Sequence, residues 1–276
     1  MDCYAEVIFI KKYTLPEYSF EYTHSVDDKP SKGLDSNHCH DTYEILYVSD
    51  GRGKYYVEGA HFNLKPRTIL LIRPFQHHCV KLDSDSVYER YVLHFHSGML
   101  CKEIRQTLDK MAGSGESESG SFFSPASISQ DIISLFDKLD RGDQFPEEER
   151  LMYLRLMLSE LVLLLSVASK ERIAHENLDV CSQVAKYIND FLDQRITLDD
   201  IAKRFFVSKY YLCRSFKKYS GVSIHSYITN KRVIYAKRLM EEGETASGAA
   251  YKVGFGDYSA FYRAYVKILG MPPTHK

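Results

Sequence analysis

The chain has 276 residues, 44% of them hydrophobic, and its 36 basic and 37 acidic residues leave a net charge of −1. This size suits one core of moderate size plus a smaller one. No apolar run can span a bilayer, because Arg155, Ser159 and Glu160 interrupt the Leu-rich stretch 151–168. The start lacks the features of a signal peptide, and six cysteines without CxxC spacing are typical of reduced thiols. We therefore expect a cytoplasmic protein with no membrane partner.

Residues 38–96 contain short runs rich in Tyr, Val, Ile and Leu, separated by Gly, Pro, Asp and Ser. Such runs are typical of strands in an antiparallel sandwich or barrel. The predicted strands are 43–48, 54–58, 68–72 and 88–96. Because residues 50–53 read Asp-Gly-Arg-Gly, they are predicted to join the first two strands as a hairpin.

Histidines and a carboxylate stand at the start of this region, as His38, His40 and Glu44, with Gly51 downstream. Residues 74–78 end in a further histidine, His78. This pattern resembles the first cupin motif and the histidine end of the second, which implies an N-terminal cupin-like β-barrel or jelly roll. On a strand, two histidines at this spacing point to the same side, and the glutamate can turn into the same cavity.

Three uses of these side chains remain open: direct contact with a small-molecule effector, binding of a divalent transition metal, or structural hydrogen bonding at the barrel mouth. Sugars suit mixed aromatic and polar walls, so a carbohydrate is one effector class. Imidazoles and a carboxylate suit a divalent metal, and no other cofactor is expected. The candidate effector-binding residues are His38, His40, Glu44, Tyr56, Arg73 and His78, and the candidate metal ligands are His38, His40, Glu44 and His78. Tyr47 and Tyr91 are further candidates for the wall.

The middle of the chain first breaks and then becomes helical. Residues 112–121 are rich in Gly, Ser and Glu and are predicted to form a mobile loop. Apolar residues then follow a helical spacing over 128–139 and 147–170, and residues 172–179 resemble a polar link. In the second helix one apolar stripe contains Leu154, Leu158, Leu161 and Leu165. This helix either packs on its own sheet or joins two protomers.

The last hundred residues contain two copies of one pattern: a small residue, a turn, an apolar stripe, an Arg, a Lys and a terminal Gly. Ala202 in the first copy corresponds to Ala250 in the second, and the second turn is one residue longer. An alanine lets two helices cross closely, and Ser208 can cap the helix after the first turn. The repeat predicts two helix-turn-helix units, whose second helices end at Gly221 and Gly270.

Residues inside the second helix of each unit divide between a buried and an exposed face. The four-residue steps Leu212 to Phe216 and Phe261 to Tyr265 predict the buried side. From Leu178 onward 16 basic residues face 9 acidic ones, whereas the rest of the chain has 20 against 28. A basic region attracts the phosphate backbone of nucleic acid. A small helical bundle with ordinary surface charge is the simpler interpretation, and the tandem repeat argues against it.

These residues clearly resemble the AraC family of bacterial transcription regulators. The resemblance is carried by 196–202, 207–218, Gly221, 253–255 and 270–273, and it implies two units joined by a linker helix at about 226–240. The basic residues of that helix are Lys231, Arg232, Lys237 and Arg238. The chain departs from the usual pattern at Phe206, where the family often has Gly, at Ala260, which offers only apolar contact, and at its end, Lys276.

The resemblance also implies which residues meet DNA. The candidates are Lys209, Tyr210, Cys213, Arg214 and Lys217 in the first unit and Ser259, Ala260, Tyr262, Arg263 and Lys267 in the second. An Arg on such a helix can make paired hydrogen bonds to guanine in the major groove. The expected partners are double-stranded DNA, a small-molecule effector, a second copy of the chain and, for an activator, RNA polymerase.

The sequence thus predicts an α+β multidomain protein with three parts. Residues 1–110 form a cupin-like effector-sensing domain, 111–177 a loop and helical connector used for dimerisation, and 178–276 an all-α tandem helix-turn-helix domain. The expected function is effector-controlled regulation of transcription, without enzyme activity. The main alternative is a metal-dependent cupin enzyme with a helical appendage. A third option is a regulator with a vestigial sensor, controlled by protein partners or abundance alone.

Overall fold

The computed structural model describes residues 7–28, 38–58, 60–83, 87–112, 121–168 and 180–273. The chain divides into two compact units, which are described separately. The first contains Met1–Asp35 and Thr42–Ala174, and the second contains Ser36–Asp41 and His175–Lys276. The predicted loop, apart from its first and last residues, and the predicted link at 172–179 lie outside the described residues, as does Lys276.

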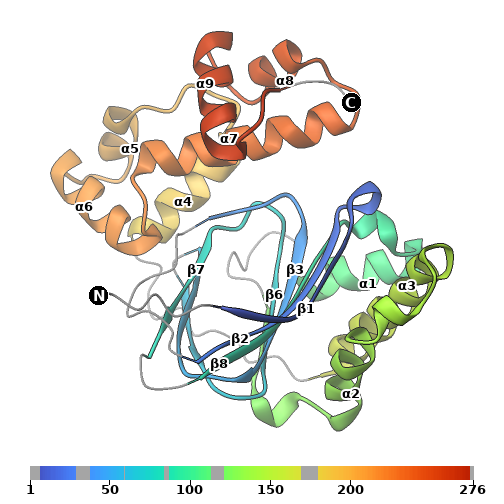
Figure 1. The fold of residues 1–276 in the computed structure, drawn as a ribbon. Helices are drawn as coiled ribbons and strands as arrows, with labels where there is room; N and C mark the ends of the chain where they lie inside the picture. The colour runs from blue at the N-terminus through green and yellow to red at the C-terminus, as the bar shows by residue number, and fades with distance from the viewer. Residues whose placement is uncertain are drawn as a thin grey trace, which may run out of the picture. The chain divides into compact units, whose positions relative to one another are not determined.

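Nine antiparallel strands form two sheets in the first unit (Figure 1), counted over the part of it that is described. The larger sheet has the order β1 (Ile8–Leu15), β2 (Phe20–Asp27), β8 (Tyr88–Phe95), β3 (Tyr43–Asp50), β6 (Thr68–Ile72) and β9 (Ser121–Phe123). The smaller has the order β5 (Ala60–Leu64), β4 (Gly53–Val57) and β7 (His78–Leu82). All four predicted strands are present. Among the described strands no pairing closes the two sheets into a barrel.

The predicted hairpin at residues 50–53 is wrong. β3 pairs with β6 and β8, whereas β4 pairs with β5 and β7, so the turn carries the chain from one sheet to the other. Gly53 permits this crossing, because a Cβ there would lie 2.4 Å from the Lys81 carbonyl oxygen. The turn chemistry was correctly recognised, but the pairing partner is a tertiary property.

Side-chain alternation along the larger sheet builds two cores. On β3, Leu46 and Val48 face the smaller sheet, whereas Ile45 and Tyr47 face the helices. The helices of this unit are α1 (Lys102–Ala112), α2 (Gln130–Leu139) and α3 (Glu147–Val167), with single 3₁₀ turns at Pro16–Tyr18, Ser97–Met99, Pro125–Ser127 and Gly142–Gln144. Figure 1 shows α1, α2 and α3 on one side of the sheet. Both faces of this sheet are therefore covered.

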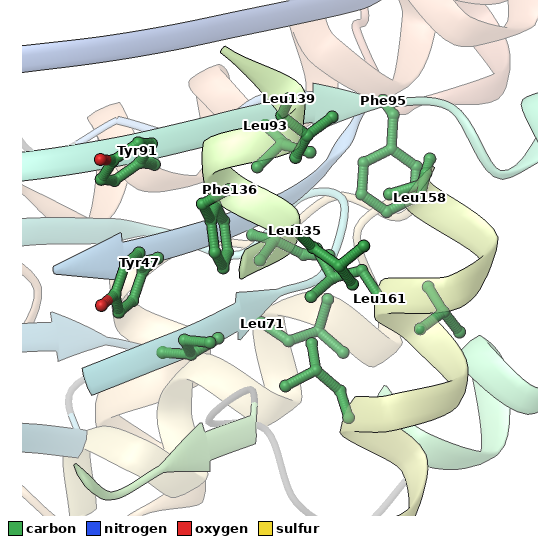
Figure 2. Packing of buried hydrophobic residues seen from close by; sticks show 14 of the residues in the cluster. Tyr47, Leu71, Tyr91, Leu93, Phe95, Leu135, Phe136, Leu139, Leu158 and Leu161 are labelled. Carbon is green, nitrogen blue, oxygen red and sulfur yellow. The ribbon is translucent and has the colours of Figure 1, made fainter. Parts of the chain in front are cut away.

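The Leu-rich stripe of α3 packs inside its own unit. Leu154, Leu158, Leu161 and Leu165 are each 0% exposed. Figure 2 shows Leu158 and Leu161 against Phe95, Leu71 and the side chains of α2. Ser129 caps α2 by accepting a hydrogen bond from the backbone N–H of Ile132. The stripe thus belongs to one core with the sheet, as the simpler of the two interpretations expected.

The second unit contains six helices in its described part, and they form the predicted tandem arrangement. The helices are α4 (Val180–Asp190), α5 (Leu198–Arg204), α6 (Lys209–Ser220), α7 (Ile224–Glu241), α8 (Ala246–Lys252) and α9 (Tyr258–Leu269). α5 and α6 form the first helix-turn-helix with a core that includes α4, and α8 and α9 form the second. α7 contributes to both cores and is the linker helix predicted at 226–240.

Residues of the repeat occupy the predicted positions. Ala202 and Ala250 are buried. Ser208 accepts a hydrogen bond from Tyr211 N at 3.2 Å and caps α6. Gly221 and Gly270 end α6 and α9 in the left-handed conformation, with φ of 76° and 71°. None of the described helices is both long and apolar enough to cross a membrane.

Candidate functional site

A buried carboxylate lies at one end of the space between the two sheets. Glu44 faces this space because it alternates with Ile45 and so points to the same side as Leu46. Its Oε2 lies 3.2 Å from Nε2 of His78 and 3.3 Å from Nε2 of His94. Its Oε1 accepts a hydrogen bond from the Tyr55 hydroxyl at 3.3 Å. β3, β4, β7 and β8 therefore each direct one polar side chain to the same point, and we call these four residues the Glu44 pocket.

The Glu44 carboxylate stabilises the charged form of the neighbouring His78 imidazole. Burial lowers the pKa of His78, but Glu44, the Gln76 carbonyl and Glu58 together raise it overall. Nδ1 of His78 lies 2.8 Å from the Gln76 carbonyl oxygen, which can only accept. Nδ1 therefore carries a proton, and Nε2 is directed at Glu44. Burial and the same carboxylate raise the pKa of the Tyr55 hydroxyl well above its usual value, so Tyr55 acts as a donor.

The loop that carries His78 is held by short hydrogen bonds. Arg73 N donates to Oε1 of Gln76 at 2.7 Å. His77 N donates to Oε1 of Glu58 at 2.8 Å, and Glu58 N donates back to the His77 carbonyl oxygen at 2.8 Å. The loop joins β6 of the large sheet to β7 of the small one, and the two bonds between His77 and Glu58 fix it to the end of β4.

Of the predicted effector-binding residues, Glu44 and His78 meet directly, and Arg73 follows the strand β6 that pairs with Glu44. Tyr56 alternates with the inward-facing Tyr55 and Val57, so Tyr55 rather than Tyr56 contacts the carboxylate. Tyr47 and Tyr91 face α2 and stack near Phe136 rather than lining the pocket (Figure 2).

The remaining two predicted residues, His38 and His40, lie in Ser36–Asp41, which belongs to the second unit. Their ring centroids are 6.0 Å apart. The four-residue metal site and the effector role of both histidines therefore stay predictions. His94 was missed by the sequence interpretation, although its alternation with the helix-facing Leu93 and Phe95 is a signal that could have identified it.

The Glu44 pocket contains the donor types that a divalent transition metal binds. Two imidazole nitrogens and one carboxylate are ligands that such ions accept. The Gln76 carbonyl fixes the tautomer and orientation of His78, as partners of ligating histidines commonly do. The same groups equally suit a polar organic molecule, because Glu44 is an acceptor for its hydroxyl or amine donors.

A second buried histidine links the sheet to the connector helices. His24 lies with Nδ1 2.8 Å from Asp140 and Nε2 2.9 Å from Glu89, and its ring stacks on Tyr91 at 3.8 Å between centroids. Burial lowers the pKa of His24, but the two carboxylates raise it overall. The resulting stabilisation is complete below the unfolded-state pKa and is lost as the pH rises through the raised folded-state pKa. Charged His24 therefore ties β2 and β8 to the end of α2.

All five candidate DNA-contacting residues of α6 are exposed, namely Lys209, Tyr210, Cys213, Arg214 and Lys217. The opposite side of the helix, with Leu212 and Phe216, is buried as predicted. One of the five, Lys209, has its Nζ 2.7 Å from Asp199 at the start of α5. α6 therefore presents a basic and aromatic face.

On α9 the exposed candidates are Ser259, Tyr262, Arg263 and Lys267, whereas Ala260 is half-buried. Asp257 caps this helix with two bonds, accepting from Ser259 N at 3.2 Å and from Ala260 N at 2.9 Å. The cap occupies one face of the helix start and leaves Tyr262 and Arg263 outward. Both second helices thus present an exposed Arg six residues after the capping residue.

The basic residues of the linker helix form bonds within the second unit. Lys231 is buried, and its Nζ donates to Oδ1 of Asn189 at 2.6 Å. Lys237 donates to Oδ2 of Asp41 at 2.8 Å. Arg232 donates to backbone carbonyls, and Arg238 pairs with Glu242 one turn away. These cations stabilise the protein itself, and the sequence interpretation did not anticipate this use.

Comparison with known proteins matches both units. Residues 28–154 match the family described as the AraC-like ligand binding domain, and 201–276 match a helix-turn-helix domain family. The uncharacterized HTH-type transcriptional regulator YbfI of Bacillus subtilis (strain 168) is 26% identical over 229 residues, which cover 81% of this chain and 80% of YbfI. The HTH-type transcriptional activator RhaS of Enterobacter sp. (strain 638) is 23% identical over 236 residues, with 81% of each chain covered.

Among solved structures, ToxT from Vibrio cholerae O395 aligns with 92% of this chain and 95% of its own, at 16% identity and a TM-score of 0.39. The matched domains and curated relatives are those of transcription regulators and not of enzymes, which argues against the metal-dependent enzyme alternative. With an AraC-like ligand-binding domain followed by a helix-turn-helix domain, the chain belongs to the AraC family of transcription regulators.

Proposed function

We propose that this regulator binds specific double-stranded DNA under the control of a small polar effector held in the Glu44 pocket. The observation that carries the proposal is the buried Glu44 carboxylate, on which His78, His94 and Tyr55 converge inside a ligand-binding domain. An ionised carboxylate has two oxygens that can accept about four hydrogen bonds in all, so Glu44 can also accept from the hydroxyl or amine donors of a ligand. Carbohydrates are one such class, and a divalent metal ion bound by the same donors is the second candidate.

The effector proposal is tested by thermal unfolding of the full chain in the presence of sugars, small carboxylic acids and divalent ions. A ligand at one hundred times its Kd should stabilise the native state by about 2.7 kcal/mol. The stabilising ligand should lose its effect on Glu44→Gln and keep it on Glu103→Gln, an exposed glutamate of α1. An equal stabilisation of both variants would place the effector elsewhere. If divalent ions raise the unfolding temperature and no organic compound does, the pocket binds a metal ion rather than an organic effector.

For DNA, we propose that α6 and α9 enter successive major grooves by their N-terminal halves. The support is the exposed Arg of each helix beside a capped terminus and a buried opposite face. Arg214 and Arg263 would each read guanine, and Lys217 and Lys267, about one turn further on, would contact phosphates. The regulator acts in the cytoplasm, where its DNA is.

We further propose that two copies pair through the outer side of α3. Beside its buried stripe, α3 exposes a second apolar row of Met152, Leu156, Leu163 and Val167, with exposed fractions of 63, 59, 48 and 82%. Their spacing places them on one side of the helix. An apolar row of this length at a surface favours a partner, and the same row on a second copy is complementary by symmetry.

Light scattering of the full chain tests this pairing. The wild-type chain should be a dimer at tens of micromolar, and Leu156→Glu should make it monomeric. Leu198→Glu is the control, because it makes the same change at an exposed leucine of the second unit. A dimer that survives Leu156→Glu would contradict the proposal. RhaS is by name an activator, and if this chain also activates, RNA polymerase is a further partner.

A further inference from the structure

The two helix-turn-helix units meet at the segment that follows α4, residues 191–194. Arg232 of α7 holds this segment, because its Nε donates to the Leu192 carbonyl oxygen at 2.9 Å and its Nη2 to the Gln194 carbonyl oxygen at 2.5 Å. α4 belongs to the core of the first helix-turn-helix, together with α5 and α6. A planar guanidinium that binds two carbonyls has a fixed orientation, unlike an ammonium group.

On its other side Arg232 reaches the turn of the second helix-turn-helix. Its Cζ lies 6.0 Å from the centroid of the Phe255 ring. A Cβ on Gly254 would lie 2.9 Å from the Arg232 Nη2 atom and 2.6 Å from the Asp193 carbonyl oxygen. The second turn therefore packs directly against the segment after α4. Val253 and Phe255, which flank Gly254, belong to the core of α8 and α9.

A single continuous helix, α7, already sets the separation of the two cores along its axis. The helix does not by itself prevent each helix-turn-helix from rotating about its axis, because apolar side-chain packing is not directional. The Arg232 hydrogen bonds are directional and lie away from the helix axis, where they resist such a rotation. Arg232 is half-buried, and its bond to the Leu192 carbonyl oxygen is partly buried, which shields that bond from competing water.

We infer that Arg232, packed against Gly254, sets the angle between α6 and α9 and thereby the spacing of the two half-sites that the regulator accepts on DNA. Arg232 is a positioning residue and contacts no base. The inference rests on the proposed reading of DNA by both helices. Two helices in successive major grooves must be separated by about 34 Å, and one added base pair displaces a half-site by about 3.4 Å along the duplex and rotates it as well. Because the Arg232 hydrogen bonds fix the angle between the two helices, such a displacement of a half-site weakens binding.

The experiment first selects the wild-type binding site from random double-stranded DNA, and then inserts or removes one base pair between the two half-sites. The wild-type full chain should bind the altered spacings about tenfold more weakly, comparable to the loss of one specific contact. Arg232→Met keeps an unbranched side chain as far as the Nε position and removes the guanidinium donors. It should bind the selected spacing more weakly and reduce the tenfold preference to about threefold, with the base preference inside each half-site unchanged.

Two further variants complete the test. Arg238→Met is the matched control, because Arg238 lies on the same helix and its Nε pairs with Glu242 one turn away; it should keep the wild-type preference. Arg232→Lys retains the charge with a single donor group and should fall between wild type and Arg232→Met, and it replaces Arg232→Met if circular dichroism shows that variant unfolded. An unchanged spacing preference in the folded Arg232 variant would overturn the role of Arg232 and leave the proposed reading of DNA by both helices intact. A selected wild-type site with a single half-site would instead overturn the two-helix reading, and this inference with it.

Discussion

The two helix-turn-helix units share one pattern, yet their turns obey different constraints. Phe206 in the first turn has a φ of 54° and is 95% exposed. Gly254, at the corresponding place in the second turn, has a φ of 86°, and a Cβ there would lie 2.6 Å from the Asp193 carbonyl oxygen. Both turns require a left-handed residue, but only the second is packed against other backbone. The same local pattern therefore tolerates Phe in one unit and requires Gly in the other.

The largest expected effect is that of Gly254→Ala. The left-handed conformation costs a residue with a Cβ about 1–2 kcal/mol, and displacement of the segment after α4 adds a similar amount, so we expect the free energy of unfolding to fall by about 3 kcal/mol. Urea unfolding followed by circular dichroism measures this change. Gly270→Ala is the control, because Gly270 has a φ of 71° but no atom within 4 Å of its Cβ position. Equal losses for both variants would show that space is not what distinguishes the second turn.

The next largest effects concern base reading. Arg214→Ala and Arg263→Ala should each weaken binding to the specific site by about 1–3 kcal/mol and affect random DNA much less. Lys217→Ala should weaken all sequences alike and reduce the slope of the salt dependence by about one. Titration of specific and random duplexes at several salt concentrations measures both. If only one Arg variant discriminates between the duplexes, then only that unit reads bases.

Helix caps should differ by a smaller amount. Asp257 accepts from two backbone N–H groups at the start of α9, whereas Ser208 accepts from one at the start of α6. Asp257→Ala should therefore destabilise the fold by about 1.5 kcal/mol and Ser208→Ala by about 1 kcal/mol. Chemical unfolding of the two variants compares them, with Asp257→Asn as the variant that keeps an acceptor. The reverse order would show that bond number does not decide the strength of these caps.

Phe206→Gly should produce the smallest change, and one of opposite sign. Relief of the left-handed backbone favours the variant by about 1–2 kcal/mol, and the greater freedom of an unfolded glycine offsets about 0.5–1 kcal/mol of it. Because Phe206 buries almost no surface, we expect a net stabilisation of about 0.5 kcal/mol, measured by the same urea titration. A loss of stability would mean that Phe206 makes packing contacts. Unchanged stability together with weaker DNA binding would assign Phe206 a role at the interface.

Local patterns in the sequence were sufficient to predict the elements and much of the exposed face proposed to read DNA. The repeat identified the buried Leu212 and Phe261 and the exposed Arg214 and Arg263, because helical spacing and capping depend on residues less than two turns apart. The strand containing Glu44 was predicted for the same reason. The fold class followed from these elements together with the resemblance to the cupin motif, and the family followed from the resemblance of the repeat residues to the AraC family.

Contacts between distant segments required the tertiary structure. The sequence alone did not show that β3 and β4 belong to different sheets, that Tyr55 and His94 rather than Tyr56 meet Glu44, or that the cations of α7 bind within the protein. Each of these facts depends on which face of an element meets a partner many residues away, and a one-residue change of register would reverse it. Local periodicity therefore determined what each segment becomes, whereas the packing of backbone against backbone decided which side chains meet and why Gly254 must be glycine.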